Sequence, residues 1–122
     1  MKENLIAEKT FEFSLKVIKL YMDLKSENEF ILSKQLLKSA TSIGANVEES
    51  IAAQSKNDFI NKLSIANKEA RETRYWLRLY EKSNLTSISM TEYLDDIEHI
   101  INILTKIIKT SKESNQHKRH NL

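Results

Sequence analysis

The chain has 122 residues, enough for one domain with a buried core. It contains one glycine, no proline and no cysteine, which excludes turn-rich β folds, glycine-rich phosphate loops, disulfide scaffolds and thiol catalysis. The net charge is only +2, so a surface for nucleic acid has to be local. Residues 1–9 lack the apolar core of a signal peptide, and we expect a cytoplasmic protein.

The first helix is expected over about residues 5–25. One set of apolar residues follows the spacing i, i+4, i+7 and i+11: Phe11, Leu15, Ile18 and Met22. A second set widens this stripe: Phe13, Val17, Leu20 and Leu24. We expect the combined stripe to face the core. Ser26, with Glu29 three residues later, predicts a capping box before the next helix.

The second helix is expected to end near Ala53. Its inward residues repeat with a helical period: Leu36, Ala40, Ile43, Val47 and Ile51. Gly44 lies inside this helix and suggests a close approach by a neighbouring helix. A polar stripe of small residues runs alongside and includes Gln35, Ser39, Ser42, Asn46 and Glu49. It is expected to hydrogen-bond with a neighbouring helix; the alternative is a polar ligand notch.

The third helix is expected to begin after Ser55, with Asp58 in the capping-box position. Its core seam follows a heptad pattern: Phe59, Leu63, Ala66, Ala70, Thr73, Leu77 and Tyr80. Ser89 and Glu92 predict the start of the fourth helix. Its inward residues again follow a heptad: Leu94, Ile97, Ile101, Leu104 and Ile108.

Beyond Lys112 the apolar period stops. We therefore expect a single domain over residues 1–112 and a flexible polar tail over residues 113–122. Four long helices with short connections predict an all-α fold, an antiparallel up-down-up-down four-helix bundle.

The chain lacks the side-chain patterns of the usual helical-bundle enzymes. A di-iron site needs Glu-x-x-His pairs, and none occurs in the sequence. His99 directly follows Glu98, which separates the two side chains by about 100° around a helix. We therefore expect no enzyme activity, no metal, no cofactor and no small-molecule substrate.

Positive charge gathers on the third helix, and residues 54–83 carry a net charge of +3. Four cations form a strip beside the core seam: Arg71, Arg74, Arg78 and Lys82. These side chains are the candidates for nucleic-acid binding through phosphate contacts. The alternative is a solvated face that pairs with Glu81 or with acidic residues of the neighbouring helices.

A second apolar group flanks the same helix outside the heptad seam. It consists of Ile65, Trp76 and Leu79. Because a bundle helix needs only one apolar stripe, we expect this group to form an oligomer interface. The alternative is a broad core that encloses Trp76.

Two stretches of sequence resemble a known family. Ser42-Ile43-Gly44-Ala45-Asn46-Val47-Glu48-Glu49 and Lys68-Glu69-Ala70-Arg71-Glu72-Thr73-Arg74-Tyr75-Trp76-Leu77 are similar to bacterial proteins of the 23S rRNA intervening-sequence type. The related accessory variability proteins of retroelements belong to the same group. The resemblance covers about residues 5–110.

The resemblance implies a four-helix bundle that assembles as a homo-oligomeric ring, expected to be a pentamer. It also implies that Asn46, Glu49, Lys62 and Glu69 make structural polar contacts within or between bundles. We therefore expect a non-enzymatic oligomer that binds RNA or a ribonucleoprotein partner through the basic strip. The alternative is a protein–protein scaffold without a nucleic-acid role and without a membrane partner.

Overall fold

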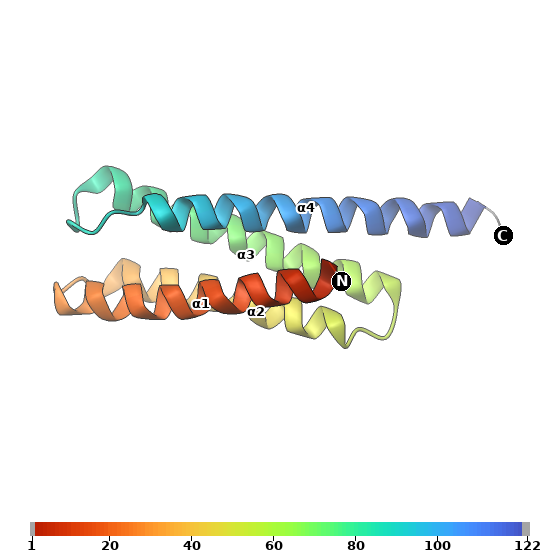
Figure 1. The fold of residues 1–122 in the computed structure, drawn as a ribbon, viewed down its shortest axis with the longest axis horizontal. Coiled ribbons are helices and arrows are strands. Elements are labelled where there is room, and N and C mark those ends of the chain that lie inside the picture. Colours follow the sequence, from red (N-terminus) through yellow and green to blue (C-terminus); the bar gives the residue numbers. More distant parts are fainter. Residues whose placement is uncertain (1, 121–122) are drawn as a thin grey trace.

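Four helices account for nearly all of the chain. The computed structural model describes the backbone of residues 2–120 and the side chains of residues 5–116. The helices are α1 (Lys2–Ser26), α2 (Ile31–Ile51), α3 (Lys56–Ser83) and α4 (Thr91–His120), and they run alternately up and down (Figure 1). The predicted all-α, up-down four-helix architecture is confirmed.

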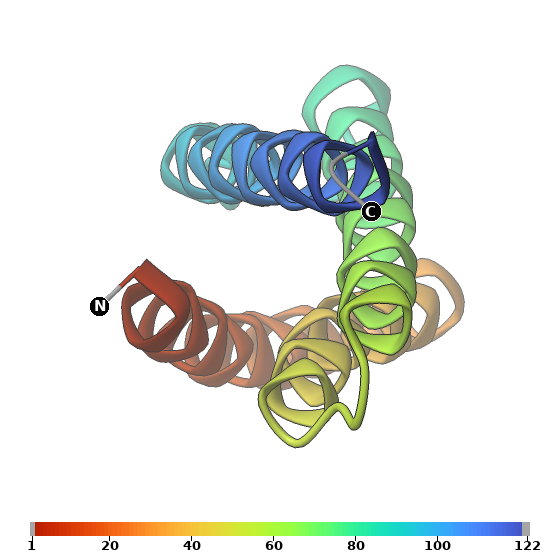
Figure 2. The same cartoon turned by 90° about the vertical axis from the view of Figure 1, so that its right-hand side faces the viewer.

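The helices pack mainly against their neighbours in the sequence. The contacts of α2 with α1 and of α3 with α2 and α4 are extensive, whereas α1 and α4 contact each other much less. Figure 2, viewed along the bundle, shows this arrangement as a ring of helices that is wider between α1 and α4. The bundle therefore has one weakly packed side.

The core is built by one apolar face of each helix. The heptad seam of α3 is buried as predicted from Leu63 to Tyr80. The inward residues of α2 are also confirmed as far as Val47, but Ile51 at the end of the helix is 49% exposed. In α4, Ile97, Ile101 and Leu104 are buried.

The expected core stripe of α1 is only half correct. The second set of apolar residues is fully buried: Phe13, Val17, Leu20 and Leu24. The first set lies on the opposite side and is 43–59% exposed: Phe11, Leu15, Ile18 and Met22. Because α1 is apolar on two faces, its own periodicity does not decide which face is covered.

The helix ends follow the predicted capping residues at two of the three positions. Ser55 Oγ accepts a hydrogen bond from the Asp58 N–H at 3.0 Å, as predicted. Ser89 Oγ accepts from the Thr91 N–H at 3.4 Å, one residue before the expected position of that contact. Ser26 caps nothing, because it is the last residue of α1 and donates its hydroxyl to the Asp23 carbonyl.

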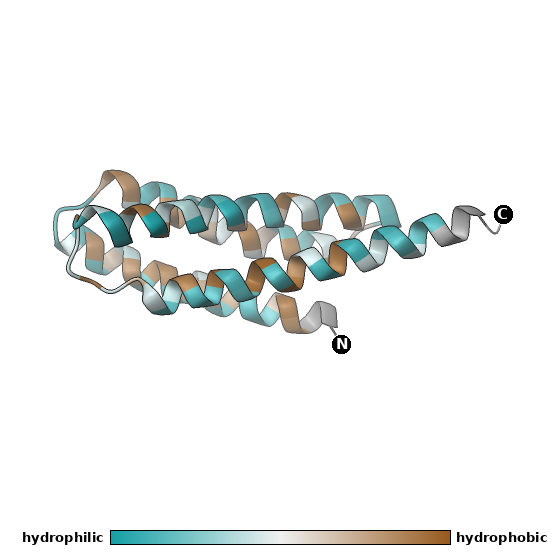
Figure 3. Ribbon diagram, turned by 90° about the horizontal axis from the view of Figure 1, so that it is seen from above, coloured by the Kyte–Doolittle hydropathy of each residue, from teal (hydrophilic) through white to brown (hydrophobic). Residues whose placement is uncertain are grey.

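The expected tail is largely helical, because α4 continues past Lys112 to His120. Asn115 Nδ2 donates a hydrogen bond to Asn57 Oδ1 at 3.0 Å, so α4 still contacts the start of α3 there. Figure 3 shows that the last coloured turns of α4 are largely hydrophilic, which explains why the apolar period ends before the helix does. Residues 121–122 of the expected tail lie outside the described residues.

Candidate functional site

The predicted basic strip lies on α3, and one of its four members, Arg74, contacts α4. Arg71 and Arg78 are exposed, and no ion pair within 4.0 Å joins either to another described residue. Arg74 differs, because its Nη1 lies 2.6 Å from Glu98 Oε1 of α4 and its side chain is 30% exposed. Lys82 is 80% exposed and lies 4.0 Å from Glu81 Oε1 on the same helix.

The four cations therefore have different roles. The Arg74–Glu98 pair joins two helices and partly neutralises the middle of the strip, as the solvated-face alternative expects. A Lys–Glu contact at 4.0 Å on an exposed helix contributes little energy. Arg71, Arg78 and Lys82 thus remain available to an anionic partner.

The predicted interface group on α3 is more enclosed than its pattern suggests. Ile65, Trp76 and Leu79 are half-buried, and Trp76 packs against the core. The Trp76 indole N–H is buried and has no hydrogen-bond partner among the described residues. The Trp76 ring also makes an edge-to-face contact with the exposed Tyr75, with centroids 5.3 Å apart. The role of this group in an oligomer stays a prediction.

The predicted polar contacts are partly brought together. Lys62 Nζ lies 3.7 Å from Glu49 Oε1, which links α3 to α2 at a position where Glu49 is 58% exposed. Asn46 instead donates to the Ser42 carbonyl within α2. Burial and the neighbouring Glu72 raise the pKa of Glu69.

A buried hydroxyl pair joins the centres of α2 and α3. Thr73 Oγ1 donates to Ser39 Oγ at 2.9 Å, and both residues are fully buried. Ser39 belongs to the predicted polar stripe, and Thr73 is the polar member of the α3 heptad seam. The stripe therefore does provide a hydrogen bond to the next helix, at Ser39.

The face that the sequence analysis missed is the exposed apolar stripe of α1, formed by Phe11, Leu15, Ile18 and Met22. A groove of about 290 Å³ lies beside it, between α1 and α2, and three stripe residues, Phe11, Leu15 and Ile18, line it. Gly44 forms part of its floor. A Cβ at Gly44 would lie 3.4 Å from the Thr10 carbonyl oxygen, so α1 and α2 do approach closely there, as the glycine suggested.

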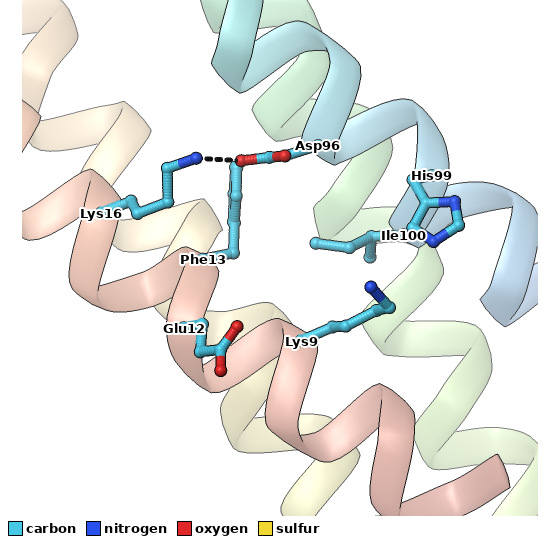
Figure 4. Close-up of a pocket in the computed structure, with 7 residues that line it drawn as sticks. All are labelled: Lys9, Glu12, Phe13, Lys16, Asp96, His99 and Ile100. Atoms are coloured by element: carbon cyan, nitrogen blue, oxygen red, sulfur yellow. Dashed lines mark hydrogen bonds and ion pairs between the residues drawn. The ribbon is translucent and has the colours of Figure 1, made fainter.

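A small polar pocket of about 140 Å³ lies on the weakly packed side between α1 and α4 (Figure 4). Lys16 of α1 reaches across and donates hydrogen bonds to Glu92 and Asp96 of α4. Lys9, Glu12 and His99 line the rest of the opening in Figure 4.

The electrostatics of this pocket fit a structural bridge. Burial alone would lower the pKa of Lys16, but the hydrogen bonds and charges of Asp96 and Glu92 outweigh it and raise that pKa. Lys16 is therefore held in its charged form, which is unsuited to a general base or a nucleophile. The three groups close the bundle between α1 and α4.

Two further properties concern the part of the chain that the structure describes. Among its residues, no group of three or more His, Asp or Glu side chains is placed to hold a metal ion. None of the described helices contains an apolar stretch long enough to cross a bilayer.

The structure is that of a small all-α protein with two notable exposed surfaces. One is the cationic flank of α3, and the other is the apolar stripe of α1. The chain belongs to the 23S rRNA-intervening sequence protein family, whose family model matches residues 2–109. The family resemblance seen in the sequence is thereby confirmed.

A solved structure supports the same assignment. The chain is 45% identical to a protein of unknown function from the S23 ribosomal protein family of Bacteroides thetaiotaomicron. The match has a TM-score of 0.84 and covers 89% of this chain and 99% of that protein. No curated protein matches the chain.

Proposed function

We propose that the chain is a non-enzymatic homo-oligomer that binds RNA or a ribonucleoprotein partner through the cations of α3. The observation that carries this proposal is the exposure of Arg71, Arg78 and Lys82 on one flank of a single helix. The chain belongs to a family whose description refers to 23S rRNA, and this supports RNA as the anionic partner.

The expected binding is weak for one subunit and depends on salt. A few phosphate contacts give non-specific dissociation constants of about 10⁻⁴ to 10⁻⁶ M, because affinity comes from the release of counterions. A homo-oligomer presents the same flank several times on one particle, which raises the apparent affinity without any new contact. Oligomerisation is therefore part of the proposed mechanism.

The experiment is a fluorescence-anisotropy titration of a labelled single-stranded RNA at 50 and 200 mM salt. We expect the double variant Arg71→Glu/Arg78→Glu to bind at least tenfold more weakly and to show a smaller salt dependence. Arg74 is left unchanged because it holds Glu98.

The matched control is Lys19→Glu/Lys34→Glu, which changes the net charge equally at exposed positions of α1 and α2. We expect a much smaller loss of affinity for this control. If both double variants lose affinity equally, the effect comes from overall charge and the α3 flank is not the binding surface. If neither loses affinity, the strip has no role.

The second candidate function is a protein–protein scaffold without a nucleic-acid role. The exposed apolar stripe of α1 favours it, because large exposed apolar patches mark interaction surfaces. Wild-type protein that does not bind RNA even at 50 mM salt would put this function ahead.

We place the homo-oligomer contact on the α1 stripe. Phe11, Leu15 and Ile18 form one wall of the groove beside α2, so an apolar helix face of a second copy could lie in that groove. Glu8, Glu12 and Glu48 line the adjoining part of this surface, and their charge disfavours RNA there. The oligomer contact and the RNA contact would thus use different faces.

The non-enzymatic part of the proposal is supported by the polar pocket between α1 and α4. Its central amine, Lys16, is paired with two carboxylates and kept protonated. The arrangement stabilises the fold and provides no activated nucleophile at Lys16.

A further inference from the structure

The proposed function does not use a pocket of about 400 Å³ at one end of the bundle. It lies where α1 begins, α3 begins and α4 passes on beyond the other helices (Figure 1). Leu5, Ile103 and Ile107 provide apolar walls. Its size falls within the range of small-molecule sites in proteins.

The charged groups that the structure describes in this pocket have one sign. Lys56 and Lys106 supply two ammonium groups, and the lining residues with described side chains include no carboxylate. Lys56 Nζ lies 5.8 Å from the centre of the Phe59 ring and forms no ion pair within 4.0 Å with the described residues. The pocket therefore offers positive charge next to an apolar surface.

Ser111 adds a hydroxyl group to the pocket. It is only 7% exposed and lines the pocket, and its hydroxyl makes no hydrogen bond to another described residue. The hydroxyl can therefore donate a hydrogen bond to a molecule in the pocket.

We propose that this pocket binds an aliphatic carboxylate, a linear hydrocarbon chain that ends in a carboxyl group. The chain would lie against Leu5, Ile103 and Ile107, and the carboxylate would accept hydrogen bonds from Lys56, Lys106 and Ser111. The molecule is a bound ligand and undergoes no reaction. This proposal does not depend on RNA binding.

The test uses the full-length chain and a series of butanoate, hexanoate and octanoate, followed by calorimetry and by amide chemical shifts. Each additional pair of methylenes should tighten binding about tenfold, because each buried methylene contributes a constant increment. The amide shifts should be confined to Leu5, Lys56 and residues 103–114. Methyl octanoate, which lacks the charge, should bind several-fold more weakly than octanoate.

Two variants test the assignment. Lys106→Gln should weaken octanoate binding about tenfold and leave methyl octanoate binding unchanged, because it removes only the charge. The control Lys109→Gln changes an exposed α4 lysine that does not line this pocket, and it should leave both affinities unchanged. Ile107→Trp should fill the pocket and abolish binding, with helicity followed by circular dichroism.

Three results would overturn the proposal. The first is the absence of saturable shifts at any chain length. The second is shifts centred on the groove between α1 and α2, which would show general apolar binding at another site. The third is equal weakening by Lys106→Gln and Lys109→Gln. If Ile107→Trp does not fold, Lys106→Gln still tests the proposal, because it leaves the apolar walls of the pocket intact.

Discussion

At the scale of single residues, Glu29 connects the start of α2 with the core. Its carboxylate accepts hydrogen bonds from the N–H groups of Leu32 at 3.0 Å and Ser33 at 2.9 Å. The buried Tyr80 of α3 donates its hydroxyl to the same carboxylate. One side chain therefore caps α2 and satisfies the polar atom of a core tyrosine.

These contacts shift the pKa values of both Glu29 and Tyr80. Burial opposes the charge of Glu29, but the hydrogen bonds from Tyr80, Leu32 and Ser33 outweigh it and lower the Glu29 pKa below 4.5. Burial, together with the hydrogen bond to Glu29, raises the pKa of Tyr80. The charged carboxylate and the neutral phenol are thus the stable pair.

We predict that Glu29→Gln lowers the free energy of unfolding by about 1 to 2 kcal/mol at pH 7, because the amide has one acceptor oxygen where the carboxylate has two and lacks the charge that strengthens these hydrogen bonds. Because the folded-state pKa of Glu29 is depressed, its contribution is present above pH 4.5 and is lost as pH falls through the folded-state pKa. The difference between wild type and variant should therefore shrink by pH 3. Urea unfolding at fixed protein concentration measures it.

The control for this prediction is Glu113→Gln, an exposed glutamate on α4 that makes no hydrogen bond with the described residues. It should change stability by less than about 0.5 kcal/mol. A stability difference for Glu29→Gln that stays constant between pH 7 and pH 3 would contradict the role of the charge.

The sequence predicted that Glu29 lies at the start of a helix, but it wrongly paired Glu29 with Ser26 in a capping box. Ser26 continues α1, and Asn28 takes the left-handed conformation with φ 67°, which ends that helix. Asparagine adopts this conformation more readily than other non-glycine residues. The Tyr80 contact spans 51 positions, so no local pattern could show it.

At the scale of elements, α1 and α2 approach each other at Gly44. The Cβ of an alanine would meet Ser14 Oγ and the Thr10 carbonyl oxygen at 3.4 Å, which is ordinary contact. Alanine also favours the helix by about 1 kcal/mol over glycine. We predict that Gly44→Ala raises the free energy of unfolding by about 0.5 to 1 kcal/mol in urea unfolding.

A larger side chain at the same position should have the opposite effect. Gly44→Leu should lower stability by about 1 to 3 kcal/mol, because its side chain must push α1 away. The exposed neighbour Ala45 provides the control, since Ala45→Gly should cost about 1 kcal/mol through helix propensity alone. Equal effects of alanine and leucine at position 44 would refute a close approach.

The elements themselves were largely predictable because α2, α3 and α4 each have one dominant apolar face. Two features of the elements were not. In α1 two apolar faces compete, and the packing of α2 decides that Phe13 and Val17 are buried while Phe11 and Leu15 are not. The helix α4 runs past the ends of the other helices (Figure 1), so it continues there without an apolar period.

At the scale of the whole molecule, the α1 stripe should control self-association. We predict that Leu15→Glu/Met22→Glu lowers the mass measured by light scattering to that of a single chain. The reason is that it places charge on side chains that are 55% and 59% exposed and lie outside the core. Circular dichroism should show unchanged helicity.

The control is Ile31→Glu, an apolar side chain that is 78% exposed at the start of α2 and outside the stripe. Its mass should equal that of the wild type. If the α1 variant keeps the wild-type mass, the contact lies elsewhere, and the group of Ile65, Trp76 and Leu79 becomes the next surface to test.

A candidate surface could be predicted where it depends on spacing within one helix, and could not where it depends on contacts between helices. The basic strip follows from the spacing of arginines on one helix, and its exposed members keep the expected face. The pairing of Arg74 with Glu98 could not be predicted, because it depends on how α4 lies along α3. The α1 stripe was recognised as apolar, but its exposure depends on the complete set of helix contacts.

The weak contact between α1 and α4 has a consequence for how the chain folds. Most contacts in the bundle join helices that follow one another, so each pairing closes a short loop at low entropic cost. Proteins dominated by such contacts have low contact order and fold quickly. The chain can form its three helical hairpins one after another, and the contacts between α1 and α4, which include the Lys16 bridge, then join the first and last helices.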